Sequence, residues 1–297
     1  MQSRLEEAVA DALGVGVTGC APLSGGDVAR SYRVTLRDGR SVFAKTHTDP
    51  PPGFFVTEAN GLRWLREARA LPVPDVLAVA DGGGPGQSGP IAMLVLEWID
   101  EGRGRPGDEA SFGRSLAQLH AAGAPCFGRE DRRPTGSRSL PNDPASTWAE
   151  FYADRRLRPL VRMAHDAAAV DGDVLTEIDH IAAHLDELGA ADEPPARLHG
   201  DLWAGNRLVD RAGRSWLIDP AAHGGHREFD LAMMRLFGGF GDAAFAAYVE
   251  AAPLQSGWRA RVPLHQLAPL LVHAIKFGGP YPTAVRRAVE DLRDAGG

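Results

Sequence analysis

Cysteine is nearly absent from this chain, which has two, Cys20 and Cys126, and no CxxC pattern. Their wide separation predicts two free thiols rather than a disulfide framework, as is typical of a reducing compartment. Long apolar runs are also missing, because no stretch approaches the roughly 18 residues that a membrane-spanning helix requires. The amphipathic, acidic N-terminus has no apolar signal core. We therefore expect a cytoplasmic protein without a membrane partner.

An excess of positive charge is absent as well. Against 32 Lys and Arg residues stand 39 Asp and Glu residues, which gives a formal net charge of −7. Because nucleic-acid binding depends on Lys and Arg contacts with phosphates, this balance argues against a nucleic-acid binder and leaves a cationic substrate open. With 297 residues, of which 44% are apolar, the chain can fold as one large domain or two lobes without a metal or disulfide.

The pattern of turns and apolar residues predicts an α+β, bilobal protein. Residues 1–98 are expected to form a small N-terminal lobe, with an antiparallel sheet and one helix inserted after the third strand. Residues 99–297 are expected to form a larger, mainly helical lobe with a short sheet-like interruption near residues 197–219. Residues 143–167 are among the segments expected to be helical. The run "HGGH" at 223–226 has no further ligands at regular spacing, so no metal–histidine site is expected there.

The interruption contains a dense group of polar residues. Its run "HGDLWAGN" places Asp201 and Asn206 five residues apart, and Asp219 ends the apolar segment that follows. Phosphoryl transfer from a nucleotide needs a carboxylate near the attacking hydroxyl and oxygen ligands for Mg²⁺. The protein-kinase catalytic loop has the same Asp-to-Asn spacing. A lone pair at this spacing arises often by chance, so the interpretation depends on the other required parts.

Those parts occur in the expected order. Lys45 lies in the third predicted strand, as a phosphate-anchoring lysine does, and Glu58 lies thirteen residues later, in the inserted helix, where it could pair with Lys45. A glycine-containing turn between the first two strands suits the covering of phosphates by backbone N–H groups; its candidate residues are Ser24, Gly25 and Gly26. The end of the fifth strand could bind adenine through its backbone; its candidates are Glu97, Trp98 and Ile99.

These motifs resemble those of the fructosamine kinase (ketosamine-3-kinase) family, in the protein-kinase-like superfamily. The resemblance rests on "HGDLWAGN", "IDP", "HREFDLAMMRLFGGF", "TWAEFYADRRLRP" and "TEANGLRWL", which together span nearly the whole chain. The tryptophan after Asp-Leu separates this family from aminoglycoside and choline kinases. The resemblance implies a bilobal protein-kinase-like fold and ATP- and Mg²⁺-dependent phosphorylation of the 3-hydroxyl of a ketosamine, which promotes deglycation of the small or protein-bound amine.

The resemblance also assigns roles to residues. Asp201 is expected to be the catalytic base, Asn206 and Asp219 the magnesium ligands, and Lys45 with Glu58 the phosphate-anchoring pair. Trp203 could stack on the sugar or pack in the core, and these alternatives stay open at even weight. His199 and Asp230 are expected to hold the catalytic loop in shape rather than to touch the substrate.

The identity of the acceptor depends on the residues around the expected sugar pocket. His223 stands where the family commonly has an aromatic residue, which could alter the sugar pocket. Another small-molecule kinase of the same fold, acting on an aminoglycoside, choline or a sugar, is the alternative, and a non-catalytic pseudokinase is a weaker one. A monomer or weak dimer is expected.

Overall fold

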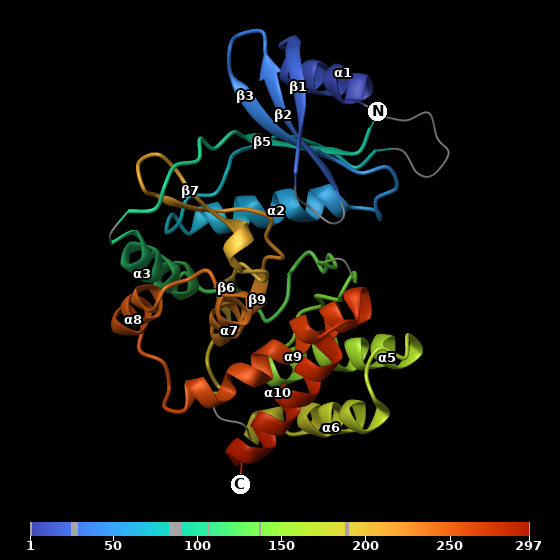
Figure 1. The fold of residues 1–297 in the computed structure, drawn as a ribbon, viewed down its shortest axis with the longest axis vertical. Helices are drawn as coiled ribbons and strands as arrows, with labels where there is room; N and C mark the ends of the chain where they lie inside the picture. The colour runs from blue at the N-terminus through green and yellow to red at the C-terminus, as the bar shows by residue number, and fades with distance from the viewer. Residues whose placement is uncertain are drawn as a thin grey trace. The chain divides into compact units, whose positions relative to one another are not determined.

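In the computed structural model, the chain folds into two compact units (Figure 1). The described residues are 2–24, 29–82, 91–105, 107–136, 138–187 and 190–296. Unit 1 comprises Met1–Arg105 and Leu208–Pro220, and unit 2 comprises Pro106–Arg207 and Ala221–Gly297. Unit 1 thus contains the expected small lobe and also residues 99–105 and 208–220, which are joined by a hydrogen bond from Gly102 N to Val209 O at 2.8 Å.

Unit 1 is built on a five-stranded antiparallel sheet in the order β1-β2-β3-β5-β4. Its elements are α1 (Gln2–Leu13), β1 (Val17–Leu23), β2 (Arg30–Leu36), β3 (Ser41–Thr46), α2 (Phe54–Glu67), β4 (Val76–Ala80) and β5 (Met93–Glu97). The turn between β2 and β3 needs Gly39, whose φ is 86°, and Asp38 Oδ1 accepts a hydrogen bond from Arg40 N at 3.0 Å. The predicted strands and inserted helix are confirmed.

The two helices of unit 1 bury apolar stripes. Leu5 and Val9 of α1 pack with alternate residues of β2 and β3, among them Val34 and Val42. Helix α2 packs against β4 and β5, and its buried face recurs at helical spacing, from Phe55 through Ala59 and Leu62 to Leu65. Full burial of one such leucine contributes roughly 1.5–3 kcal/mol. This packing fixes the rotation of α2 and therefore the direction of its polar residues.

A hairpin at the end of unit 1 carries the chain to residue 220. Its strands are β7 (Arg207–Val209) and β8 (Ser215–Leu217). The Asp210 carboxylate accepts hydrogen bonds from Ala212 N at 2.9 Å, Arg214 N at 3.0 Å and Trp216 Nε1 at 2.9 Å. Leu217 N donates to Pro72 O at 2.9 Å, which anchors the hairpin on unit 1. The hairpin therefore fixes the position of the residues that follow β8.

Unit 2 is mainly helical, as predicted. Its elements are α3 (Asp108–Ala121), α4 (Trp148–Tyr152), α5 (Arg158–Asp166), α6 (Gly172–Ala183), β6 (Ala196–Leu198), β9 (His223–Gly225), α7 (Glu228–Phe237), α8 (Asp242–Ala251), α9 (Trp258–Phe277) and α10 (Tyr281–Gly296). Strands β6 and β9 pair antiparallel. Helix α9 packs against α5, α7 and α10, and α3 packs against α8 (Figure 1).

The segment of residues 143–167 is mostly helical, as expected, but it contains an irregular turn. It consists of α4, a π-helical turn at Ala153–Leu157 and then α5. The helical period of the sequence does not reveal this turn, because one extra residue per turn only shifts the pattern slightly. Within the described ranges, no helix has both the length and the apolar character needed to cross a membrane.

Candidate active site

Unit 1 places a buried lysine between two carboxylates. Lys45 of β3 is 7% exposed, and its Nζ lies 2.9 Å from Glu58 Oε1 of α2. The same Nζ lies 2.5 Å from Asp219 Oδ1, which follows the β7–β8 hairpin. The ion pair between Lys45 and Glu58 that the sequence predicts is confirmed. Contact with Asp219, 174 residues away in the chain, was not foreseen.

This contact keeps the lysine charged. Burial alone would lower the pKa of Lys45, but the carboxylates of Glu58 and Asp219 outweigh it and hold that pKa above its usual range. Burial and the second carboxylate raise the pKa of Glu58, although Lys45 opposes this shift. A desolvated ammonium beside carboxylates is suited to anchor anionic phosphate groups.

Asp219 has an unusual backbone conformation. Its φ is 55°, in the left-handed region that a non-glycine residue rarely adopts, and Pro220 follows it. Such a conformation costs on the order of 1–3 kcal/mol and persists where the surroundings impose it, often at functional sites. Here it brings the carboxylate to Lys45.

Unit 2 brings Asp201 and Asn206 together on the segment of residues 199–206, the candidate catalytic loop. Asn206 Nδ2 donates to Asp201 O at 2.8 Å and to Asp201 Oδ2 at 3.1 Å, and Asn206 is buried. A 3₁₀ turn at Ala204–Asn206 makes this return contact possible. Because the amide nitrogen donates to Asp201, the amide oxygen is the atom through which Asn206 could hold a metal.

A fully buried aspartate holds this loop. Asp230 of α7 is 0% exposed, and its carboxylate accepts hydrogen bonds from His199 N at 2.8 Å and Gly200 N at 2.9 Å. Burial raises the pKa of Asp230. The hydrogen bonds from His120 and Gly200, together with the nearby His199, have a larger opposite effect, and the pKa of Asp230 therefore lies below its usual range. These contacts agree with the supporting role expected for Asp230.

His120 is a supporting residue that sequence reasoning missed. It lies on α3, with Nε2 at 3.2 Å from Asp230 Oδ2 and Nδ1 at 2.8 Å from the hydroxyl of Tyr248. Its only sequence signal is a polar residue on the buried face of the run "SLAQLHAA". His120 Nε2 and His199 N contact the same oxygen, Asp230 Oδ2, so this network helps to hold the carboxylate in place.

Trp203 is 40% exposed, so its side chain is not enclosed in the core. A Cβ added to Gly205 would come within 2.2 Å of its indole, so only glycine lets the ring lie against the 3₁₀ turn. Gly239, with φ of 85°, approaches Ala204 so closely that a Cβ there would lie 2.3 Å from the Ala204 Cβ. The glycines of the two motifs therefore position the indole two residues after Asp201. The core-packing alternative for Trp203 is wrong.

The expected nucleotide-binding segments are described only in part. Gly25 and Gly26 lie outside the described residues, and Ser24 forms a bend after β1. At the end of β5, Glu97 N donates to Asp75 O at 2.9 Å, and Ile99 is buried. The Trp98 indole donates to Asp100 Oδ1 at 3.2 Å.

His223 lies in β9 and lines a hollow of unit 2 that is also lined by Phe151, Arg156 and Phe229. Its Nδ1 lies 2.8 Å from Ala221 O. Burial, together with the nearby Arg156, lowers the pKa of His223 to about 3, so the ring is neutral at physiological pH. His223 is buried, and Gly200 approaches its ring, so the ring packs against the segment of residues 199–206.

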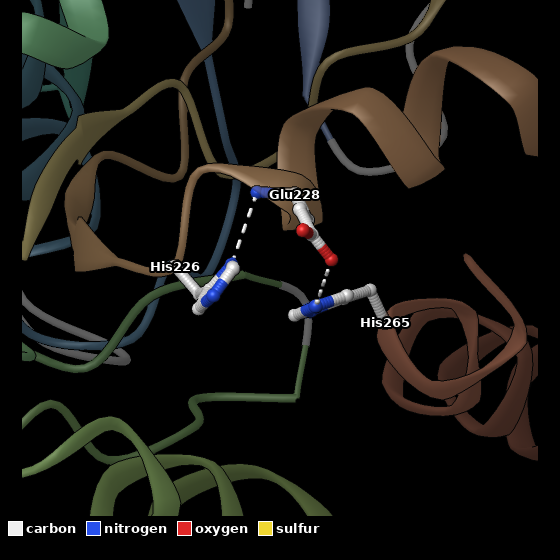
Figure 2. A group of neighbouring side chains, drawn as sticks. All are labelled: His226, Glu228 and His265. Atoms are coloured by element: carbon white, nitrogen blue, oxygen red, sulfur yellow. Dashed lines mark hydrogen bonds and ion pairs between the residues drawn. The ribbon is translucent and has the colours of Figure 1, made fainter. Parts of the chain in front are cut away.

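A second polar cluster in unit 2 consists of His226, Glu228 and His265, whose possible ligand atoms lie within 4.8 Å of one another (Figure 2). Sequence spacing gave no hint of it. Arg261 donates to both Glu228 oxygens, at 2.6 and 2.9 Å. His226 Nδ1 accepts from Glu228 N at 3.2 Å, and its Nε2 lies 2.9 Å from Ala190 O. Because most ligand atoms are already bound, this is a buried ion-pair cluster rather than a metal site.

Comparison with known proteins agrees with these motifs. The fructosamine kinase family model matches residues 1–295. A protein of Thermus thermophilus, assigned as a ketoamine kinase, is 37% identical over 268 residues, 90% of this chain and 92% of that protein. The chloroplastic protein-ribulosamine 3-kinase of Arabidopsis thaliana is 32% identical, over 86% of this chain and 76% of its own.

A solved structure extends the agreement to the fold. The crystal structure of a Thermobifida fusca protein, assigned as a fructosamine-3-kinase, is 41% identical, with a TM-score of 0.87 and 98% of each chain covered. Together with the sheet order and the helical second unit, this likeness confirms the expected α+β, protein-kinase-like fold.

Proposed function

This chain belongs to the fructosamine kinase family and is an ATP-dependent kinase, and we propose that its acceptor is the 3-hydroxyl of a ketosamine. A ketosamine is the rearranged adduct of a sugar with an amine, and phosphorylation at this position makes the adduct labile. The observation that carries the assignment is the exposed indole of Trp203 two residues after Asp201. An apolar face beside a carboxylate suits the C–H surface and the hydroxyl of a sugar.

The chemical step needs one proton acceptor and in-line positioning. In the proposed reaction, a carboxylate oxygen of Asp201 accepts the proton of the 3-hydroxyl, whose oxygen forms a bond to the γ-phosphorus as the bond to the β-phosphate oxygen breaks and ADP leaves. Asn206 orients this carboxylate by donating to Oδ2 at 3.1 Å. Asp230 holds the loop through its bonds with the N–H groups of His199 and Gly200.

Unit 1 supplies the nucleotide contacts in this proposal. Lys45 binds phosphate oxygens, and Glu58 keeps its ammonium in position. The phosphate contacts predicted for Gly25 and Gly26 stay a prediction from the sequence, because these residues lie outside the described ranges. Adenine recognition falls to the backbone of Trp98 and Ile99, because Glu97 N is already bound to Asp75 O.

The donor set is suited to magnesium, which prefers hard oxygen ligands. Asn206 and Asp219 are the residues that would hold it, Asn206 through the amide oxygen left by its bond to Asp201 and Asp219 through a carboxylate that is 38% exposed. When bound, magnesium neutralises phosphate charge that develops during transfer.

The proposal is tested by measuring phosphorylation of fructosamine, ribulosamine and erythrulosamine, with kanamycin and choline as competing acceptor classes. We expect at least one ketosamine to be used far better than kanamycin or choline. Preference for either of those would overturn the acceptor assignment and leave the kinase mechanism standing. Absence of magnesium-dependent ATP turnover with every acceptor would instead indicate a non-catalytic protein. The cytoplasmic location that we propose agrees with two cysteines that are both free.

A further inference from the structure

A row of aromatic rings leads away from Trp203 within unit 2. The Trp203 ring centroid lies 6.3 Å from that of Phe237, which lies 4.9 Å from that of His273. His273 lies 5.4 Å from Phe277 and 4.9 Å from Tyr281. The row therefore begins on the catalytic loop, crosses the last residue of α7, and ends where α9 meets α10.

The far end of this row is exposed. Among the described residues, the exposed large apolar side chains are Leu77 at 38%, Trp203 at 40% and Phe277 at 50%. Two of these three lie at opposite ends of the aromatic row. A single exposed phenylalanine needs no explanation, but one joined by ring contacts to the tryptophan that is proposed to face the sugar points to a binding surface.

Local structure holds the far end in place. His273 Nδ1 lies 2.8 Å from Pro269 O, one helical turn earlier, which sets the direction of the ring. Helix α9 ends directly after Phe277, at Gly278 with φ of 61°, and α10 begins at Tyr281, whose ring lies 6.2 Å from that of Phe277. We call Phe277 and Tyr281 the distal platform.

We propose that the distal platform is a carrier subsite, where Phe277 and Tyr281 bind the apolar stem of the amine to which the sugar is attached. This inference rests on the proposed function. A ketosamine has three consecutive parts: the sugar, a secondary amine that is largely protonated, and the carrier stem. With the sugar against Trp203, the ammonium reaches the middle rings, where aromatic faces attract a cation, and the stem reaches the distal platform.

The occupant follows from continuity and chemistry. Adjacent ring contacts through Phe237 and His273 join the platform to Trp203, so a molecule that extends from the acceptor hydroxyl along these rings would reach it. Apolar rings bind methylene groups more favourably than further hydroxyl groups. If each methylene of the stem is buried against the platform, kcat/KM rises by up to about fourfold per methylene.

The experiment uses fructosamines of methylamine, propylamine and pentylamine with the full chain. For the wild type, kcat/KM is expected to rise with stem length, mainly through KM. In Phe277→Ala and Tyr281→Ala, we expect the methylamine adduct to be unaffected and the pentylamine adduct to lose about tenfold in kcat/KM. Phe277→Leu should restore part of the dependence. Leu77→Ala, a comparably exposed apolar residue of unit 1, is the matched control.

Two results would overturn the inference. One is a wild type whose kcat/KM is independent of stem length, or whose dependence survives both alanine variants. The other is dissociation of a dimer by Phe277→Ala in sedimentation velocity with an unchanged stem dependence, which would show that a second copy covers the platform. Failure of the proposed function is distinct, since the wild type would then phosphorylate none of the three adducts.

Discussion

The ammonium of Lys45 lies 2.9 Å from the carboxylate of Glu58, and both side chains are largely buried in unit 1. Asp219 approaches the same ammonium at 2.5 Å, so one cation balances two carboxylates. Removing one of these charged groups should destabilise unit 1, because the remaining buried charge is then desolvated without a partner. The cluster therefore links the stability of unit 1 to its proposed binding of phosphates.

Lys45→Met removes the cation but not the two carboxylates. We expect kcat/KM for ATP to fall by at least about 10- to 100-fold, the value of a charge-assisted hydrogen bond. Glu58→Gln, which keeps the shape of the side chain, should have a smaller effect in the same direction. Steady-state kinetics and thermal melts of both variants separate loss of binding from loss of folding. Unchanged ATP kinetics in Lys45→Met would remove Lys45 from the phosphate site.

Asp201→Asn keeps the size of the side chain and removes its basicity. Turnover should fall by about 10²–10⁴-fold, while ATP affinity stays nearly the same. Asp219→Ala provides the contrast, because loss of a metal ligand should weaken binding of magnesium–ATP and catalysis together. Nucleotide titration followed by initial-rate measurements distinguishes the two patterns. A near-normal kcat in Asp201→Asn would place the base elsewhere.

Trp203→Ala removes the indole from the loop surface. Since stacking on a sugar is largely apolar burial, KM for a ketosamine should rise by roughly tenfold while KM for ATP changes little. Measuring both constants with the same preparation provides the internal control. Equal increases in the two constants would indicate a distorted loop rather than a lost acceptor contact.

His223 makes stability depend on pH. Because burial lowers its pKa to about 3, the unfolded chain binds a proton on this ring between about pH 6.5 and 3 and the folded chain does not. The free energy of unfolding should therefore rise with pH, by about 1.4 kcal/mol per pH unit from this residue. His226, whose pKa burial lowers to about 4, acts in the same direction.

His223→Phe should reduce that slope between pH 4.5 and 6, whatever its effect on stability at neutral pH. Urea unfolding at several pH values measures the slope directly, and His223→Gln serves as a second variant that also cannot titrate. A slope that both variants share with the wild type would contradict the buried neutral ring.

The cluster of His226, Glu228 and His265 should not bind zinc. Arg261 donates hydrogen bonds to both oxygens of Glu228. Burial raises the pKa of this carboxyl, but His265 and Arg261 lower it by more, so that the pKa is about 2. Incubation with zinc followed by dialysis should leave no bound metal, and EDTA should not change the melting temperature. One zinc per chain that disappears in His265→Ala would refute this.

Local sequence was sufficient for much of the fold and part of the site. Strand alternation and turn residues predicted the sheet of unit 1, and helical spacing predicted α2 with Glu58 on it, because these signals arise within a few residues. The spacing of five residues identified Asp201 and Asn206 as candidate site residues, but their hydrogen bond was found only in the structure. The motif residues were therefore identified before any packing was known.

Contacts between distant segments were decided only by tertiary structure. Asp219 meets Lys45 across 174 residues, and His120 meets Asp230 across 110, because hairpin and helix packing bring together residues that no local pattern connects. The spacing of apolar residues in the sequence likewise did not predict the π-helical turn after α4. Local propensity determines which elements form, but the exposure of Trp203 and its continuity with Phe277 depend on how the helices of unit 2 bury their apolar faces.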